Sequence, residues 1–590
     1  MRKIKRVIGY TLGIAMVLIA AIFLLNLHLT KRLERYLRKE LIHRTAEATD
    51  GFYRLSFDNL SISFFKGELT LEGIKLCPDS VVFRDWERKD SLPSVYVTAE
   101  VGMVDFKGLN LTWRRSYKQL HFDSFEIRNP DIQVFNPYYS TRAEVKERKE
   151  AEIKTLYEVV SPYINVLTVR MLNLENASVS YSVENPVSPI VYALNDVSFH
   201  AYGFRLDENS SESGKLLYCD NFDFITKRSQ TLLANNDFRL QTDRILLSTE
   251  DSIISISNIT LTPQGELWGE QKKRPDSYLN ALIRAIEVKG IQFRRENALN
   301  YLTARSLDII SSDIQAFNLA GESLPSAKKT EKKSLNEAEA DSLVRSLSLY
   351  ELISPVLHTV SIGTVGIGQA KLQYSFAVKD KIEVYKLANF DFQANDFRID
   401  SVSETQRGFW YSRGFSFEAT GIEGLMTARN HRFTVKRMTL DTESGDFNLE
   451  RIRLYPLSVC GQNDYMAGSI DTVGIRGLLY DKGISARLLK IDRPNLRYVL
   501  FSSFNKKDVK SVKPANSRVG VESILNPFLR YFSVKRLSLN HAYVTIDDKS
   551  MSDPVTYKLN DFNFFATGIW VNRQTGKGSG LFFDYGNMGF

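Results

Sequence analysis

The chain has 590 residues, with 77 Lys and Arg against 69 Asp and Glu, and therefore a formal net charge of +8. This length exceeds one compact core and predicts several domains or a repeat array. Charged residues at 25% and apolar residues at 43% exclude wholesale disorder, and the wide spacing of Cys77, Cys219 and Cys460 argues against a disulfide framework or a CxxC metal site.

The first 29 residues have the pattern of a membrane anchor. Residues 1–6 (MRKIKR) are strongly basic, and residues 7–27 carry no charge over a length that could span a bilayer core. The apolar run is long and no small-residue cleavage site follows it, which favours an uncleaved signal anchor over a removed signal peptide. We therefore expect a cytoplasmic tail and transmembrane anchor over residues 1–29, with the bulk of the chain exported.

Residues 30–50 continue as a predicted juxtamembrane helix. Leu33, Tyr36, Leu37 and Leu41 fall on one stripe of that helix. Two interpretations remain open: a simple helical stalk, or a face that lies on lipid headgroups.

A long internal repeat organises the rest of the chain. The pattern apolar-x-apolar-x-x-apolar-x-apolar-x-Pro occurs three times, and successive copies are separated by 185 and 193 residues. Its apolar positions are Leu69, Leu71, Ile74 and Leu76, then Ile254, Ile256, Ile259 and Leu261, then Phe447, Leu449, Ile452 and Leu454. A second pattern, apolar-x-apolar-basic-Gly-apolar, also occurs three times, around Gly108, Gly290 and Gly477. These matches predict a β repeat at residues 51–237, a second at 238–430, and an incomplete third at 431–590.

Within each repeat the apolar residues alternate with polar ones, which predicts strands with one apolar and one polar face. The two-residue step at Gly73, Asn258 and Arg451 would invert the faces, so we expect a β-bulge there. Charged helices are expected between strand blocks, at residues 141–160, 334–353 and, more weakly, 506–518.

No catalytic or cofactor motif stands out. HExxH, GxSxG and Walker patterns are absent, and Gly576 to Gly580 is better explained as a hairpin turn. Basic residues are dispersed, which argues against nucleic-acid binding. The sequence therefore predicts neither an enzyme nor a resident cofactor or metal.

A β-sheet with one apolar face must cover that face, and the predicted helices are too few and too charged to do so. Two solutions remain open from the residues alone: the sheet folds on itself over a dry core, or it curls around a bound apolar ligand.

The N-terminal arrangement resembles the AsmA-like family, which includes the TamB-type envelope proteins. The resemblance rests on the basic tail and anchor, on residues 51–57 (GFYRLSF), and on the strand 67–71 (GELTL). The phrases 125–132 and 489–496, each with a central proline, also fit. The resemblance covers the chain after residue 7 and rests mainly on hydrophobic patterns.

The resemblance implies a bridge-like lipid transfer protein: an elongated, curled β-sheet anchored in the inner membrane, with its bulk in the periplasm. The twelve apolar positions above would then line a groove for phospholipid acyl chains, with outer-membrane or other envelope proteins as further partners. This chain is shorter than the long bridging members of that family. The alternative function is a membrane-tethered scaffold for envelope assembly that carries no lipid.

Overall fold

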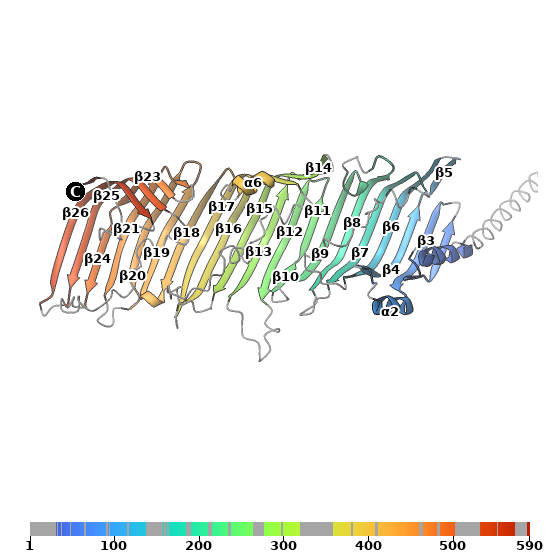
Figure 1. The fold of residues 1–590 in the computed structure, drawn as a ribbon, viewed down its shortest axis with the longest axis horizontal. Helices are drawn as coiled ribbons and strands as arrows, with labels where there is room; N and C mark the ends of the chain where they lie inside the picture. Colours follow the sequence, from blue (N-terminus) through green and yellow to red (C-terminus); the bar gives the residue numbers. More distant parts are fainter. Residues whose placement is uncertain are drawn as a thin grey trace, which may run out of the picture. The chain divides into compact units, whose positions relative to one another are not determined.

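The computed structural model describes residues 31–136, 157–263, 277–318, 358–501, 531–572 and 587–589, with short gaps inside these ranges. The chain is mainly β with few helices, as the alternating pattern predicted. It divides into two compact units: unit 1 comprises residues 1–267 and 288–301, and unit 2 comprises residues 268–287 and 302–590. In each unit long strands lie side by side in a large, mostly antiparallel sheet (Figure 1).

The elements of the N-terminal part are as follows. The strands and helices are β1 (Tyr53–Ser56), β2 (Asn59–Ser63), β3 (Glu68–Pro78), α2 (Ser80–Arg88), β4 (Tyr96–Lys107), β5 (Asn110–Arg114), β6 (Tyr117–Asn136), β7 (Val166–Val183), β8 (Ile190–Leu206), η1 (Leu216–Tyr218), β9 (Asn221–Leu233), β10 (Phe238–Thr242), β11 (Arg244–Ser248), β12 (Ile253–Pro263), β13 (Ser277–Lys289) and β14 (Gln292–Glu296).

The remaining elements belong to unit 2, apart from the first residues of β15. They are β15 (Leu299–Asn318), β16 (Thr359–Val378), β17 (Lys381–Ile399), α6 (Ser401–Gln406), β18 (Gly414–Met426), η4 (Thr427–Arg429), β19 (His431–Asp441), β20 (Asp446–Pro456), β21 (Tyr465–Arg476), β22 (Leu479–Tyr480), β23 (Ile484–Asp492), β24 (Asn495–Leu500), β25 (Tyr531–Asp548), β26 (Val555–Asn572) and β27 (Asn587–Gly589).

Strand pairing repeats along the chain at the offsets found in the sequence. In unit 1, β10 pairs with β12 so that Leu240 lies opposite Leu261. In unit 2, β19 pairs with β20 so that Phe433 lies opposite Leu454, 193 residues further on. The parallel pair β6–β7 in unit 1 has a counterpart in the parallel pair β23–β25 in unit 2. These offsets define equivalent positions in the two units; the boundaries of the three repeats remain a prediction.

At the two-residue step of the repeated pattern the backbone is kinked. In β3 and β20 the kink inserts no extra residue relative to the partner strand. Gly73, Asn258 and Arg451 all adopt positive φ, at 60°, 50° and 52°. The pairing of β19 with β20 keeps the same register on both sides of Arg451, and β3 keeps its register with β4 on both sides of Gly73. The expected β-bulge is therefore replaced there by a left-handed residue, which returns the next apolar side chain to the same face without shifting the partner strand. We call these three positions kink residues.

The N-terminal edge of unit 1 is covered by the predicted juxtamembrane helix, which is helical at residues 38–47. The carboxylate of Glu34 accepts a hydrogen bond from the Ile62 N–H of the edge strand β2, at 3.2 Å. The guanidinium of Arg38 donates to the carbonyl of Phe57 at 2.9 Å and lies 4.5 Å from the centre of its ring. These contacts protect strand edges that could otherwise pair with another chain.

A short helix that the sequence analysis did not predict, α2, packs at the ends of the first strands (Figure 1). Asp79 caps it by accepting hydrogen bonds from the N–H groups of Val81 and Val82. Its inner face joins an aromatic cluster, in which the rings of Trp86 and Phe52 stack at 4.9 Å. The spacing of Phe83 and Trp86 behind an Asp cap was the available signal.

Several expectations concern residues outside the described part of the chain. The anchor at residues 7–27 and most of the helices expected at 141–160, 334–353 and 506–518 lie there. Among the residues that the structure describes, no helix has the length and apolar character needed to cross a bilayer.

Candidate functional site

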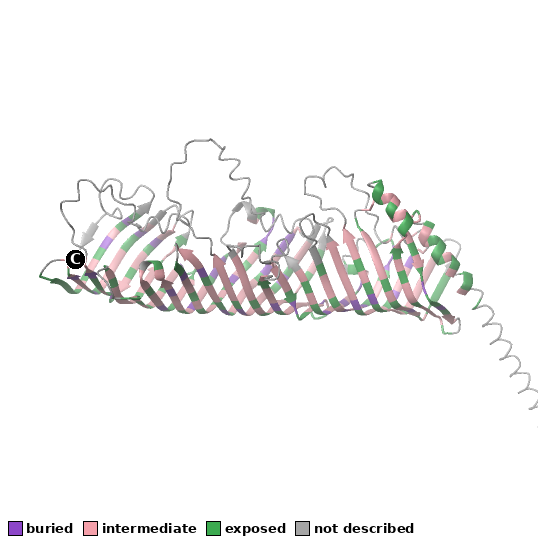
Figure 2. Ribbon diagram, turned by 90° about the horizontal axis from the view of Figure 1, so that it is seen from below, coloured by how far each residue is buried: buried purple, intermediate pink, exposed green. Residues whose placement is uncertain are grey.

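The apolar face of unit 1 carries a continuous row of apolar side chains from β2 to β12. Each member lies directly opposite the next on the neighbouring strand. The row is Leu60, Leu71, Val104, Ile127, Leu174, Phe199, Phe224, Leu247 and Ile254. Except for the buried Leu60, these side chains are only partly buried, so apolar surface remains accessible along the row. In Figure 2, which colours the ribbon by burial, most of the strand length is intermediate or exposed.

Unit 2 carries a corresponding row from β16 to β25. It consists of Ile367, Phe392, Phe417, Leu440, Phe447, Ile475, Leu489 and Leu537. All eight are intermediate in exposure. Side chains packed into a closed core are usually almost fully buried, whereas these keep part of their surface accessible.

The structure places the twelve predicted groove residues on three strands, four each on β3, β12 and β20. Their neighbours are apolar in each case: Leu71 lies opposite Leu60 and Val104, Ile256 opposite Ile245, and Leu449 opposite Met438 and Val473. Only Ile259 is buried, at 8% exposure, and the other eleven are partly exposed. The structure thus brings the residues of each set together, with the first two sets in unit 1 and the third in unit 2.

On three of the long paired strands a small buried residue directly follows a residue with positive φ: Asn176 at 55°, Gln369 at 54° and His541 at 52°. Ala177, Ala370 and Ala542 each have 0% exposure and occupy equivalent places in β7, β16 and β25. In each strand the register shifts by one residue at the alanine and then returns. The apolar pattern alone did not reveal these fully buried small positions.

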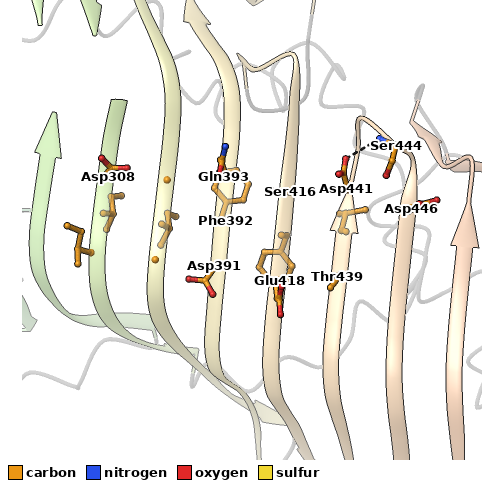
Figure 3. A pocket seen from close by; sticks show the side chains of 17 residues that line it. Asp308, Asp391, Phe392, Gln393, Ser416, Glu418, Thr439, Asp441, Ser444 and Asp446 are labelled. Carbon is orange, nitrogen blue, oxygen red and sulfur yellow. Dashed lines mark hydrogen bonds between the residues drawn. The ribbon is translucent and has the colours of Figure 1, made fainter. Parts of the chain in front are cut away.

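A hollow of about 780 Å³ lies along β15 to β20 of unit 2, and four residues of the apolar row are among its lining: Ile367, Phe392, Phe417 and Leu440 (Figure 3). Gly366 and Gly368 lie among its lining residues, and they contribute no side chain to fill it. Carboxylates from successive strands surround it: Asp308, Asp391, Glu418, Asp441 and Asp446. Within the described residues, no three His, Cys, Asp or Glu side chains are grouped so that they could hold a metal ion.

The polar face of unit 1 has a hollow of about 700 Å³ at a different place, around the kinks of β8 to β12. Every lining residue is polar, and the side chains hydrogen-bond to each other. Arg228 pairs with Asp196 at 2.9 Å, and the amide of Asn258 donates to Asp243 at 2.7 Å. The charge of Arg228 is therefore balanced within the lining, whereas the carboxylate of Asp243 is met only by a neutral amide.

Two equivalent aspartates close turns after β8 and β17. Asp400 accepts hydrogen bonds from the N–H groups of Val402 and Ser403 and pairs with Arg398 at 2.6 Å. Asp207 pairs with Arg205 in the same way. Burial acts to raise the pKa of Asp400, but the hydrogen bonds from Ser403 and the Arg398 guanidinium outweigh it and hold the pKa below its usual value.

The cysteines do not form a reactive centre in the described part of the chain. Cys77 is exposed and Cys219 is buried, and both are free thiols. Burial, followed by the nearby charge of Asp220, raises the pKa of Cys219 to about 11. A thiol with that pKa is almost entirely protonated at neutral pH and is a poor nucleophile.

Comparisons with known proteins add little. No protein-family model matches the chain, and no curated protein matches it. One solved structure, described as the crystal structure of Sex pheromone staph-cAM373 precursor, is similar at 10% identity with a TM-score of 0.10, and the match covers 60% of this chain and 88% of that chain. A likeness this weak supports no argument about fold or function.

Proposed function

We propose that the apolar faces of both units bind phospholipid acyl chains, and that the protein conducts them between membranes along an elongated, curled sheet. The observation that carries this proposal is the pair of unbroken apolar rows whose side chains stay partly exposed. An apolar surface of this extent is unfavourable in water unless a ligand or another surface covers it. Acyl chains are long, flexible and non-directional, and they fit a row of Leu, Ile, Val and Phe without hydrogen-bond partners.

The proposal also draws on the resemblance to the AsmA-like family. The anchor predicted at residues 7–27 would hold the protein at the inner membrane, with its bulk in the periplasm. The covered N-terminal edge is consistent with a sheet that begins close to the anchor helix. No catalytic step is proposed. The alternative is a membrane-tethered scaffold that closes its apolar faces against itself or an envelope partner and carries no lipid.

Two substitutions on neighbouring residues of β20 test the proposal. Leu449→Arg places a charge on the apolar face, and Asn448→Arg places the same charge on the exposed polar face. A charge in contact with hydrocarbon costs several kcal/mol unless it reaches water or a partner. We expect Leu449→Arg to reduce co-purifying phospholipid severalfold with little change in the thermal melt, and Asn448→Arg to leave both unchanged.

The measurement is lipid mass spectrometry on full-length protein purified in detergent, alongside the thermal melt. Ile256→Asp, with Ser255→Asp as its neighbour control, repeats the test in unit 1. Wild-type protein that is folded but free of lipid, together with apolar-face variants that simply unfold, would favour the scaffold.

A further inference from the structure

On the polar face of unit 2, the strands β19 and β20 bring together three cations, none of which forms an ion pair with a described residue. Lys436 lies opposite Arg451, because the flanking pairs are Val435–Ile452 and Arg437–Glu450. Arg453 lies two residues further along β20, opposite Thr434. All three side chains are exposed. We call Lys436, Arg451 and Arg453 the cationic cluster.

The carboxylates around the cationic cluster are paired with other arginines. Glu450, next to Arg451 in the chain, lies 4.0 Å from Arg437, and Asp471 lies opposite Arg451 on β21. Glu418 pairs with Arg437 at 2.8 Å. Glu423 pairs with Arg432 at 2.8 Å, and Asp471 with Arg493 at 2.8 Å. Among the described residues, none forms an ion pair with Lys436, Arg451 or Arg453. Because Arg437 is shared between Glu418 and Glu450, one of these carboxylates offsets part of the charge of the cluster, and the rest is available to an anion outside the sheet.

Two local preferences are violated at Arg451. Like charges directly opposite each other on paired strands destabilise a sheet. The positive φ of 52° is also a conformation that arginine adopts reluctantly, whereas Gly73 and Asn258, at the equivalent kinks, belong to residue types that tolerate it. When several unfavourable local features occur together at one site, the site often has a role in binding.

The groups next to Arg453 are suited to an oxyanion. The hydroxyl groups of Tyr455 and Thr434 hydrogen-bond each other beside its guanidinium. The hydrogen bond with Thr434, then the hydrogen bond and charge of Arg453, lower the pKa of Tyr455 against the opposing effect of burial. The same surroundings that favour a phenolate favour an external anion. Guanidinium groups recognise phosphate oxygens through paired, charge-assisted hydrogen bonds.

We propose that the cationic cluster is a binding site for a phosphate group, carried either on a lipid headgroup or as free phosphate. The site lies on the polar face, opposite the apolar row of β19 and β20, so it is separate from the proposed acyl-chain face. At the equivalent positions of unit 1 the residues are Asp243, Asn258 and Thr260, which explains why the same backbone there offers no such site.

The test uses full-length protein in detergent and two soluble probes: inorganic pyrophosphate, and glycerophosphoglycerol, the deacylated form of an anionic headgroup. The key variant combines K436D, R451N and R453T, which installs the residues that unit 1 already uses at these positions. The control combines K535D, R536T and R487N, which removes the same total charge from exposed positions on β23 and β25. Calorimetry measures binding, and a thermal melt confirms folding.

Wild type should bind at least one probe, the key variant should bind it roughly tenfold more weakly or worse, and the control should bind like wild type. Preference for glycerophosphoglycerol would identify a headgroup as the source, and preference for pyrophosphate a free phosphate. The reciprocal unit 1 variant, D243K with N258R and T260R, should add a second equivalent of bound probe. Equal losses in the key variant and the control, or no binding by wild type, would overturn the proposal.

Co-purifying lipid provides an independent readout. The key variant should keep its acyl-chain lipid, because its substitutions lie on the other face. Failure of the phosphate site and failure of the lipid groove would therefore be seen in different measurements.

Discussion

The kinks of unit 1 and unit 2 share a backbone but not a charge pattern. In unit 1, Asn258 hydrogen-bonds Asp243, and Arg228 pairs with Asp196. In unit 2, Arg451 has the same left-handed backbone as Asn258 but faces Lys436 on β19 and Asp471 on β21. Gly421 stands where unit 1 has Arg228.

This difference distinguishes the features that determine the fold from the side chains that vary between the two units. The apolar rows and the kinks recur in both units, because losing either would place apolar side chains on the wrong face. The charged positions on the outer face contribute little to strand pairing, so they can change without changing the architecture. This is the expected result when function depends on side chains carried by a shared scaffold.

The largest effect is expected where the two units are alike. Ala177→Leu and Ala370→Leu each add bulk at a fully buried position beside a kink. Each should destabilise the protein by about 1–3 kcal/mol, because an overpacked site must displace its neighbours. Denaturant unfolding measures the change, and Leu479→Ala, at a side chain that is 69% exposed, is the control with little expected effect. A large loss in one unit and none in the other would show that the two alanine positions are not equivalent.

A smaller effect is expected at the shared aspartate turns. Asp400→Ala removes the acceptor for two N–H groups at the start of α6 and should cost about 1 kcal/mol, as other helix caps do. The pKa of Asp400 lies below its ordinary value of 3.8, so its contribution is complete above that pH and is lost as the pH falls further. Wild type and variant should therefore converge in stability under acid.

Thermal melts across the acid range check this, and Asp207→Ala should behave in the same way in unit 1. Asp396→Ala is the control, because its pair with Arg413 is exposed and surface pairs contribute little. A difference between wild type and Asp400→Ala that persists unchanged in acid would contradict the assigned role of the carboxylate.

Much of the fold could be predicted from the sequence, because the alternation of apolar and polar residues along a strand can be read from the residue order. The patterns at Leu71, Ile256 and Leu449 predicted apolar neighbours, and the structure supplies them. The kinks were located correctly but assigned to bulges, because a two-residue step does not reveal whether an extra residue is inserted or one residue turns left-handed.

The cationic cluster and the hollow of unit 2 were missed for a different reason. The opposition of Lys436 and Arg451 depends on the register of two strands and cannot be seen in either strand alone. The hollow beside Gly366 likewise depends on which side chains neighbouring strands present. The 193-residue offset was the available signal, since it aligns Asp243 with Lys436 and Asn258 with Arg451.

The smallest effect, and the most direct test of the contrast between the units, concerns the kink residue of β20. Arg451→Asn installs the residue of unit 1, which tolerates positive φ better and ends the like-charge opposition with Lys436. We expect it to stabilise the protein by about 0.5–1 kcal/mol at low salt, an unusual sign for a substitution. The electrostatic part should shrink near 1 M salt, where screening is strong, whereas the backbone part should remain.

The matched control is Arg493→Asn, at another left-handed arginine whose charge is already compensated by Asp471 at 2.8 Å. Arg493→Asn should show no salt-dependent gain in stability, because removing a charge that is already paired relieves no repulsion. Saturating pyrophosphate should then reverse the order of wild type and Arg451→Asn in the thermal melt, since a ligand stabilises the form that binds it. If Arg451→Asn instead destabilises the ligand-free protein, then Arg451 has a stabilising partner, the cationic cluster is not strained, and the contrast between the two kinks reflects structure alone.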